Sequence, residues 1–88
     1  MNLKPQAAIT LNNKADALNK LGKYEEAMEN IDEALKKDPK MPALFLTKGE
    51  ILINLNECNR ALKCFDEALK FDPDYEPAKK AREEILLS

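Results

Sequence analysis

The chain has 88 residues, enough for one small domain with a single core. Lys and Arg number 14 against 16 Asp and Glu, and the net charge of −2 argues against a nucleic-acid-binding protein, which normally shows a basic excess. No apolar run approaches the ~18 residues of a transmembrane helix, and the first residues lack the apolar stretch of a signal peptide, so we expect a soluble cytoplasmic protein that does not bind membranes.

Helical periodicity covers nearly the whole chain, and no strand is predicted. Apolar residues spaced three and four apart predict five helices, which in chain order span about 6–21, 24–37, 42–55, 58–71 and 76–87. Gly22 and Asn56 separate the helices of the first and second pairs, because these residue types tolerate the left-handed conformation that ends a helix. The chain is therefore expected to be all-α.

Prolines mark the remaining boundaries. We expect Asp38-Pro39 and Asp72-Pro73 to end the second helix of each pair, because a residue that precedes proline is pushed out of helical space. Pro42 and Pro77 suit the first turn of the next helix, where a missing N–H costs nothing.

An internal repeat organises these helices. The segment IDEALKKDP at 31–39 returns as FDEALKFDP at 65–73, and an ungapped alignment of 8–41 with 42–75 gives 11 identities at an offset of 34 residues. Small residues recur where two helices would approach closely, at Ala15, Gly49, Ala27, Ala61, Ala34 and Ala68. The sequence thus predicts two repeats, 8–41 and 42–75, followed by a last helix within 76–88.

A helix–turn–helix unit of 34 residues has the period of the tetratricopeptide repeat (TPR), and residues 8–75 resemble that family. The matching residues are Gly22 to Ala27, Ala34-Leu35 and Asp38-Pro39 in the first unit, and Gly49, Ala61, Phe65, Ala68-Leu69 and Asp72-Pro73 in the second. The resemblance implies one all-α domain over 1–88, a helical-repeat solenoid of two antiparallel TPR-like repeats with a C-terminal capping helix.

The two ends of the predicted array differ. Ala78, Ala81 and Ile85 form a narrow apolar stripe on an otherwise charged last helix, which resembles the solvating helix that terminates such arrays. The first repeat carries Thr10 where the second carries Leu44, so its outer side is polar. We expect a self-contained unit, or one end of a longer protein.

Residues that could support catalysis or bind a metal are scarce. The chain has no His, and Cys58 and Cys64 lie six residues apart, which on one helix excludes a disulfide and does not match the spacing of zinc ligands. We expect free thiols, no cofactor, no metal and no enzymatic activity. Charged residues four apart are expected to form ion pairs, namely Asp32–Lys36, Glu33–Lys37 and Asp66–Lys70.

The resemblance also implies a binding surface, because the first helix of each pair lines a concave groove in such arrays. Matched onto this chain, the inner faces of the first, third and fifth helices hold Ile9, Asn12, Asn13, Asp16, Asn19 and Lys20, then Ala43, Leu46, Thr47, Glu50, Ile53 and Asn54, then Lys80, Glu84 and Leu87. We expect this groove to bind a peptide or protein segment. Leu46 and Ile53 could either pack under the capping helix or offer an apolar contact to a partner.

One specialisation of the family is not expected here. Members that clamp the C-terminal carboxylates of Hsp70 or Hsp90 resemble one another in placing Lys, Asn, Asn, Lys and Arg across three successive first helices. The matching positions in this chain hold Asn12, Asp16, Thr47, Pro77 and Ala81. Since Asp16 would repel a carboxylate, we do not expect this clamp.

Self-association is the alternative function. The second repeat carries many apolar residues, and we do not expect one short capping helix to cover all of them; they are Leu44, Phe45, Leu46, Ile51, Leu52, Ile53 and Leu55. Under this alternative the protein is a structural homodimer.

Overall fold

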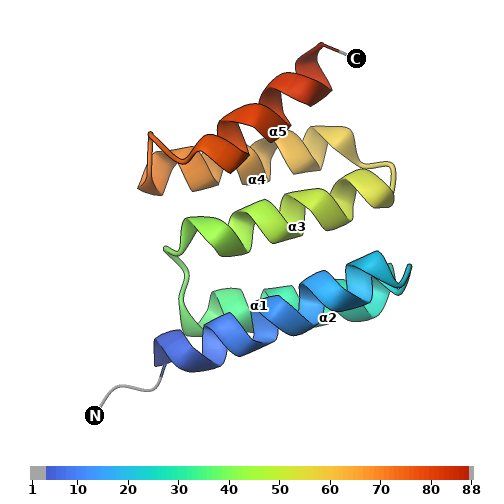
Figure 1. Ribbon diagram of the computed structural model, residues 1–88, viewed down its shortest axis with the longest axis vertical. Helices are drawn as coiled ribbons and strands as arrows, with labels where there is room; N and C mark the ends of the chain where they lie inside the picture. The colour runs from blue at the N-terminus through green and yellow to red at the C-terminus, as the bar shows by residue number, and fades with distance from the viewer. Residues whose placement is uncertain (1–3, 88) are drawn as a thin grey trace.

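Five α-helices make up almost all of the chain. The computed structural model describes residues 4–87, and within that range the helices are α1 (Lys4–Lys20), α2 (Tyr24–Lys37), α3 (Pro42–Asn54), α4 (Cys58–Phe71) and α5 (Glu76–Leu86), with no strand (Figure 1). Each helix bound lies within two residues of its predicted position, the usual scatter of helix ends. The all-α prediction is confirmed. None of the helices in this range combines the length and the apolar character needed to cross a bilayer.

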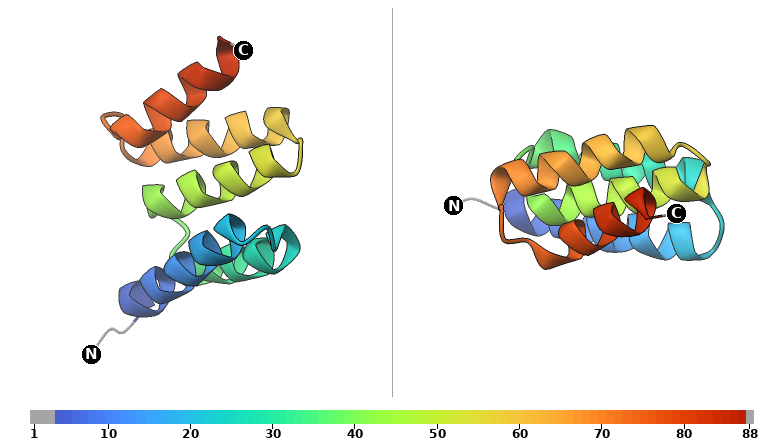
Figure 2. Two further views of the ribbon diagram at one scale, coloured as in Figure 1. Left: turned by 45° about the vertical axis from the view of Figure 1, so that its right-hand side comes forward. Right: turned by 90° about the horizontal axis from the view of Figure 1, so that it is seen from above.

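The helices stack as successive antiparallel pairs. α1 packs against α2 and α3 against α4, while α3 joins the pairs by contacting both α2 and α1, and α5 packs on α4. Seen from above, α1 and α5 lie along one side of the stack and α2 and α4 along the other (Figure 2). The result is a slab of 44 × 29 × 15 Å, as expected when each repeat packs on its neighbours in sequence.

The turn inside each repeat has the same backbone geometry. Gly22 has a φ of 81° and Asn56 a φ of 65°, the left-handed conformation predicted for both. After Gly22, the N–H of Lys23 donates to the carbonyl of Leu18 at 2.9 Å, and the equivalent bond after Asn56 is 2.8 Å long. These bonds satisfy carbonyls that the end of a helix would otherwise leave without partners.

The second helix of each repeat also ends in the same way. Asp38 and Asp72 have extended backbones, as expected for residues that precede proline. Each aspartate also accepts a hydrogen bond on Oδ1 from a backbone N–H two residues on, from Lys40 at 3.3 Å and from Asp74 at 3.1 Å. The chain is thereby turned into α3 and α5, each of which has a proline in its first turn.

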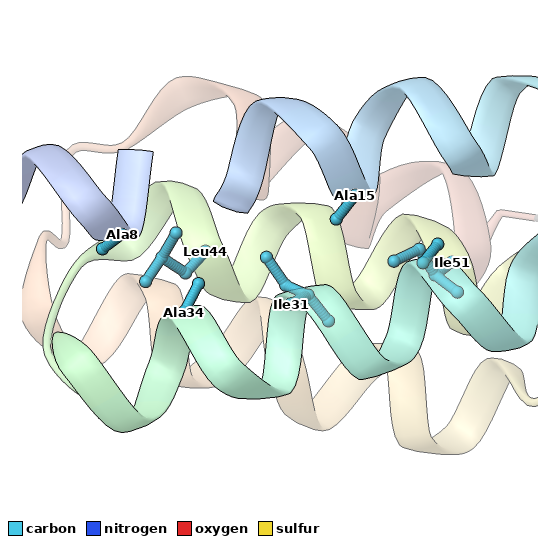
Figure 3. Packing of buried hydrophobic residues seen from close by; sticks show 7 residues of the cluster. Ala8, Ala15, Ile31, Ala34, Leu44 and Ile51 are labelled. Atoms are coloured by element: carbon cyan, nitrogen blue, oxygen red, sulfur yellow. The ribbon is translucent and has the colours of Figure 1, made fainter. Parts of the chain in front are cut away.

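The core consists of two adjoining clusters of buried side chains. The first joins α1, α2 and α3 through Ala8, Ala15, Ala27, Ile31, Ala34, Leu44 and Ile51 (Figure 3). The second joins α3, α4 and α5 through Leu52, Ala61, Cys64, Phe65, Ala68 and Ala78. All six small residues predicted at close helix contacts are buried, so the helices approach one another where the sequence indicated.

The apolar residues of the second repeat are covered to different degrees. Leu44, Ile51 and Leu52 are buried, and the other four residues of that set are half-buried. None of the seven is exposed, because the first cluster encloses one side of α3 while α4 and α5 enclose another. Four residues of this set thus keep part of their surface accessible, in line with the expectation that one short capping helix does not cover all of it.

The ion pairs of the second helices differ from the expected ones. Asp32 pairs with Lys48 at 2.8 Å, and Asp66 pairs with Arg82 at 2.8 Å. Each pair thus joins the second helix of a repeat to the next helix, through a residue 16 positions further along the chain. Residues 4–87 form none of the expected pairs, which were Asp32–Lys36, Glu33–Lys37 and Asp66–Lys70. The prediction was wrong because it considered only charges on the same helix. The cations that pair with Asp32 and Asp66 come from the neighbouring helix.

Candidate binding groove

A concave cavity of about 620 Å³ lies on the face that α1 and α3 share. Its lining residues are Asn12, Asn13, Asp16, Asn19 and Lys20 of α1, Ala43, Leu46, Thr47, Glu50, Ile53 and Asn54 of α3, and Tyr75, which directly precedes α5. The lining therefore comes from the first helix of each repeat, and it mixes amides and charges with apolar side chains.

The structure brings together most of the residues matched to the groove from sequence, but not all of them. Ile9, Lys80, Glu84 and Leu87 lie outside the cavity. Ile9 is 41% exposed one turn before Asn12. The α5 residues lie outside because α5 rests on α4 and rises away from the array towards its C-terminal end (Figures 1 and 2).

Tyr75 also lines the cavity, whereas the residues predicted from the sequence all lie on the inner faces of helices. It stands 34 residues after Met41, in the short connection before α5, and its side chain packs against the second core cluster. Partial burial raises the pKa of the Tyr75 hydroxyl, with smaller contributions from the nearby carboxylates of Glu50 and Asp72. An aromatic residue at the joint between the second repeat and the capping helix was the signal that could have identified it.

Hydrogen bonds fix the floor of the groove. Asn19 is 8% exposed, and its Oδ1 accepts a hydrogen bond from Nδ2 of Asn54 at 3.0 Å, which ties α1 to α3. Thr47 is also buried, and its hydroxyl donates to the carbonyl of Ala43 at 3.2 Å. With these polar groups satisfied, the floor is held in one arrangement.

The two carboxylates of the groove have different environments. Asp16 forms an ion pair with Lys20 at 3.1 Å, one turn along α1. Glu50 occupies the equivalent position on α3, but the residue one turn along is Asn54, and Glu50 makes no hydrogen bond or ion pair within residues 4–87. Desolvation raises the pKa of Glu50, the charge of Asp16 raises it further, and Lys20 lowers it in part.

A second acceptor in the groove also lacks a partner. Oδ1 of Asn12 is buried and accepts no hydrogen bond in the described part of the chain. A buried polar atom without a partner costs free energy, so native proteins contain few of them. The groove thus contains a buried amide oxygen without a partner and an exposed carboxylate without a partner.

Leu46 and Ile53 both pack against the core and line the cavity. Both are half-buried and pack against the cluster that contains Ala78 of α5. Both also line the cavity. The two roles left open from the sequence are therefore compatible, since α5 covers these side chains only in part.

The cysteines lie away from this site. Cys58 is exposed, Cys64 is buried, and both are free. Burial raises the pKa of the Cys64 thiol, which keeps the group protonated and weakly reactive at neutral pH. Residues 4–87 contain no cluster of three or more His, Cys, Asp or Glu placed to hold a metal ion.

Comparison with known proteins agrees with the fold. A family model described as tetratricopeptide repeat matches residues 18–85, which is most of the chain. A search of curated proteins found no match. The matched region contains both left-handed turns, the helices α2, α3 and α4, and all of α5 except its last residue. The chain belongs to the tetratricopeptide repeat family.

Proposed function

We propose that the groove between α1 and α3 binds an extended peptide or protein segment of a partner, and that the protein is a non-catalytic interaction module. The family points to protein–protein interaction in general. The observation that supports the groove as the binding surface is the cavity of about 620 Å³ on the first helices of both repeats. Concave sites of this size with a few polar groups among apolar ones are the usual places for ligands.

The lining offers the two kinds of contact that an extended segment needs. Asn12 and Asn13 carry amides that can exchange hydrogen bonds with a peptide backbone. Leu46 and Ile53 offer apolar surface on the α3 side. The bond between Asn19 and Asn54 fixes the helices that carry these groups, so little conformational entropy is lost when a segment binds.

A pair of matched asparagine variants tests this proposal. Asn13 is exposed in the groove, whereas Asn59 is exposed on α4 outside it, and replacing either with Arg adds the same bulk and charge without touching the core. Peptides are first selected on the wild type from a random linear library, and the affinity of the best one is measured by fluorescence anisotropy. We expect Asn13→Arg to weaken binding at least about tenfold by filling the groove, and Asn59→Arg to leave it unchanged. Equal affinities for the two variants would contradict the proposal.

Self-association is the second candidate, and exposed leucines at the end of α5 favour it. Leu86 and Leu87 are 56% and 82% exposed. Leu86 corresponds in the repeat to Leu18 and Leu52, which pack into the core, so α5 presents an apolar position that a second copy could cover. Sedimentation of the wild type and of Leu86→Lys checks this. A concentration-dependent dimer that the substitution abolishes is the result expected for a homodimer, and a monomer in both proteins excludes it.

The two free cysteines support a reducing compartment, and we place the proposed function in the cytoplasm on that ground.

A further inference from the structure

The groove contains more hydrogen-bond acceptors than its own donors satisfy. Oδ1 of Asn12 is buried without a partner. The carboxylate of Glu50 has neither a hydrogen bond nor an ion pair within residues 4–87. The amide of Asn54, one turn along from Glu50, already donates to Asn19 at 3.0 Å. The oxygen of Asn12 is covered by the protein itself, whereas the exposed carboxylate of Glu50 remains open to a donor from outside the chain.

The charges of the groove favour a cation as that donor. Asp16 and Glu50 carry two negative charges, and Lys20 is the one basic residue among the lining side chains. Lys20 is already paired with Asp16 at 3.1 Å. The lining therefore has an excess of one negative charge, which is located on Glu50.

The repeat shows that this excess arises at one position. Asp16 and Glu50 are equivalent across the 34-residue offset, and so are Lys20 and Asn54. The first repeat supplies a cation for its carboxylate, and the second replaces that cation with an amide. Partial desolvation of Glu50, reinforced by Asp16, raises its pKa in the free protein, and a bound cation would lower that pKa.

We propose that the groove recognises an arginine side chain of the bound segment, with the guanidinium paired to the exposed carboxylate of Glu50. A guanidinium suits this site better than an ammonium because it carries five N–H donors in a planar fork, and because it is less strongly hydrated. The ring of Tyr75, at the α5 end of the same cavity, adds a surface on which a guanidinium can stack. This inference rests on the proposed function and specifies the chemistry of the ligand.

A double-mutant cycle between protein and peptide tests the pairing. Peptides are selected on the wild type from the random library, and those whose binding Asn13→Arg abolishes are kept as groove ligands. We expect these to be enriched in arginine. For the tightest one, Glu50→Gln and replacement of the peptide arginine by glutamine should each weaken binding about tenfold or more, and the two changes together should cost little more than either alone.

Two further variants separate recognition from folding. Glu33→Gln makes the same change of charge on α2, outside the groove, and should leave the affinity unchanged. Glu50→Lys should prefer the peptide in which glutamate replaces the arginine. This reversal depends on a direct pairing, and a loss of folding could not produce it.

The outcomes distinguish the inference from the proposed function. Groove ligands without an enrichment in arginine, or additive effects in the cycle, overturn the arginine inference and leave peptide binding in the groove intact. If no selected peptide depends on Asn13, both the inference and the proposed function are overturned. Enrichment, coupling and reversal together establish the pairing.

Discussion

The two repeats build the same backbone from different side chains at their closest helix contact. Ala15 of α1 corresponds to Gly49 of α3, and Ile31 of α2 corresponds to Phe65 of α4. A Cβ added at Gly49 would lie 2.7 Å from Cζ of Phe65, so the glycine is what admits the aromatic ring. The larger residue of one helix thus faces the smaller residue of the other. Close packing constrains the combined volume at this contact more than the identity of either residue.

The same comparison explains why α5 can end the array. α1 and α3 present Leu11 and Phe45 towards their second helices, and the ring of Phe45 stacks on Phe71 with centroids 5.8 Å apart. At the equivalent position α5 carries Lys79, and at the position of Gly49 it carries Glu83. Charged, exposed side chains there solvate the face that a further helix would otherwise cover.

Exchanging the packing pair of one repeat for that of the other should give the largest effect. Phe65→Ile leaves a cavity in the second cluster and should cost about 1–3 kcal/mol. Gly49→Ala overpacks the ring and should cost about 1–2 kcal/mol, after the gain in helix propensity that alanine brings. The double variant recreates the Ala and Ile pair of the first repeat and should recover most of the stability, as measured by urea unfolding. Purely additive losses would show that the two contacts are not equivalent.

The left-handed turns offer the next comparison. A Cβ at Gly22 would meet no atom within 4 Å, so Gly22→Ala carries only the backbone cost of a positive φ, about 1–2 kcal/mol. Asn56 already bears part of that cost at a φ of 65°, and Asn56→Gly should stabilise the protein by up to about 1 kcal/mol. Thermal melts of the two variants check both signs. Shifts in the same direction would contradict the shared turn geometry.

The two ion pairs between helices should differ in strength, since they differ in exposure. The side chain of Lys48 is 24% exposed in its pair with Asp32, whereas that of Arg82 is 45% exposed in its pair with Asp66. Surface pairs of this kind contribute about 0.2–1 kcal/mol, and screening reduces the more exposed one further. Double-mutant cycles with Asp→Asn and Lys or Arg→Met should give the larger coupling for the Lys48 pair. A larger coupling for the Arg82 pair would contradict the ranking by exposure.

The carboxyl group of Glu50 should make stability depend on pH, and this is the smallest of the expected effects. The pKa of Glu50 is raised in the fold above its ordinary value of 4.5, so the folded protein binds this proton more tightly than the unfolded chain. The wild type therefore loses stability relative to Glu50→Gln as the pH rises from 4.5 through the raised pKa, and the two proteins should converge below that range. Melting temperatures measured across these pH values test the sign. A wild type that becomes the more stable protein at neutral pH would contradict it.

Most of the fold could be predicted because its determinants are local. The left-handed turns at Gly22 and Asn56 and the helix ends at Asp38 and Asp72 follow from the backbone preferences of those residues and of the prolines that follow the aspartates. The 34-residue offset then fixes which helix faces meet. These features need no knowledge of how one helix pair is rotated on the next.

What the sequence did not predict depends on that rotation. Asp32 meets Lys48 because α3 crosses α2 at the level of those residues. Tyr75, in the joint before α5, lines the groove, whereas Lys80 and Glu84 of α5 lie outside it. The helix α5 diverges from the array towards its C-terminal end (Figure 1). For Glu50, the sequence indicated the missing partner only in part, because Asn54 stands one turn along where Lys20 follows Asp16. Nothing in the sequence indicated that the amide oxygen of Asn12 is buried without a partner.

The central claim is that partners bind on the concave face of α1 and α3, and amide chemical-shift mapping tests it most directly. ¹⁵N-labelled protein is titrated with the tightest peptide from the library, and shifts are followed for every backbone amide. We expect the largest shifts at groove positions such as Asp16, Thr47 and Glu50, with small shifts at Glu29 and Glu33 on the outer face of α2. The largest shifts on α2 and α4, with the groove amides unmoved, would contradict it.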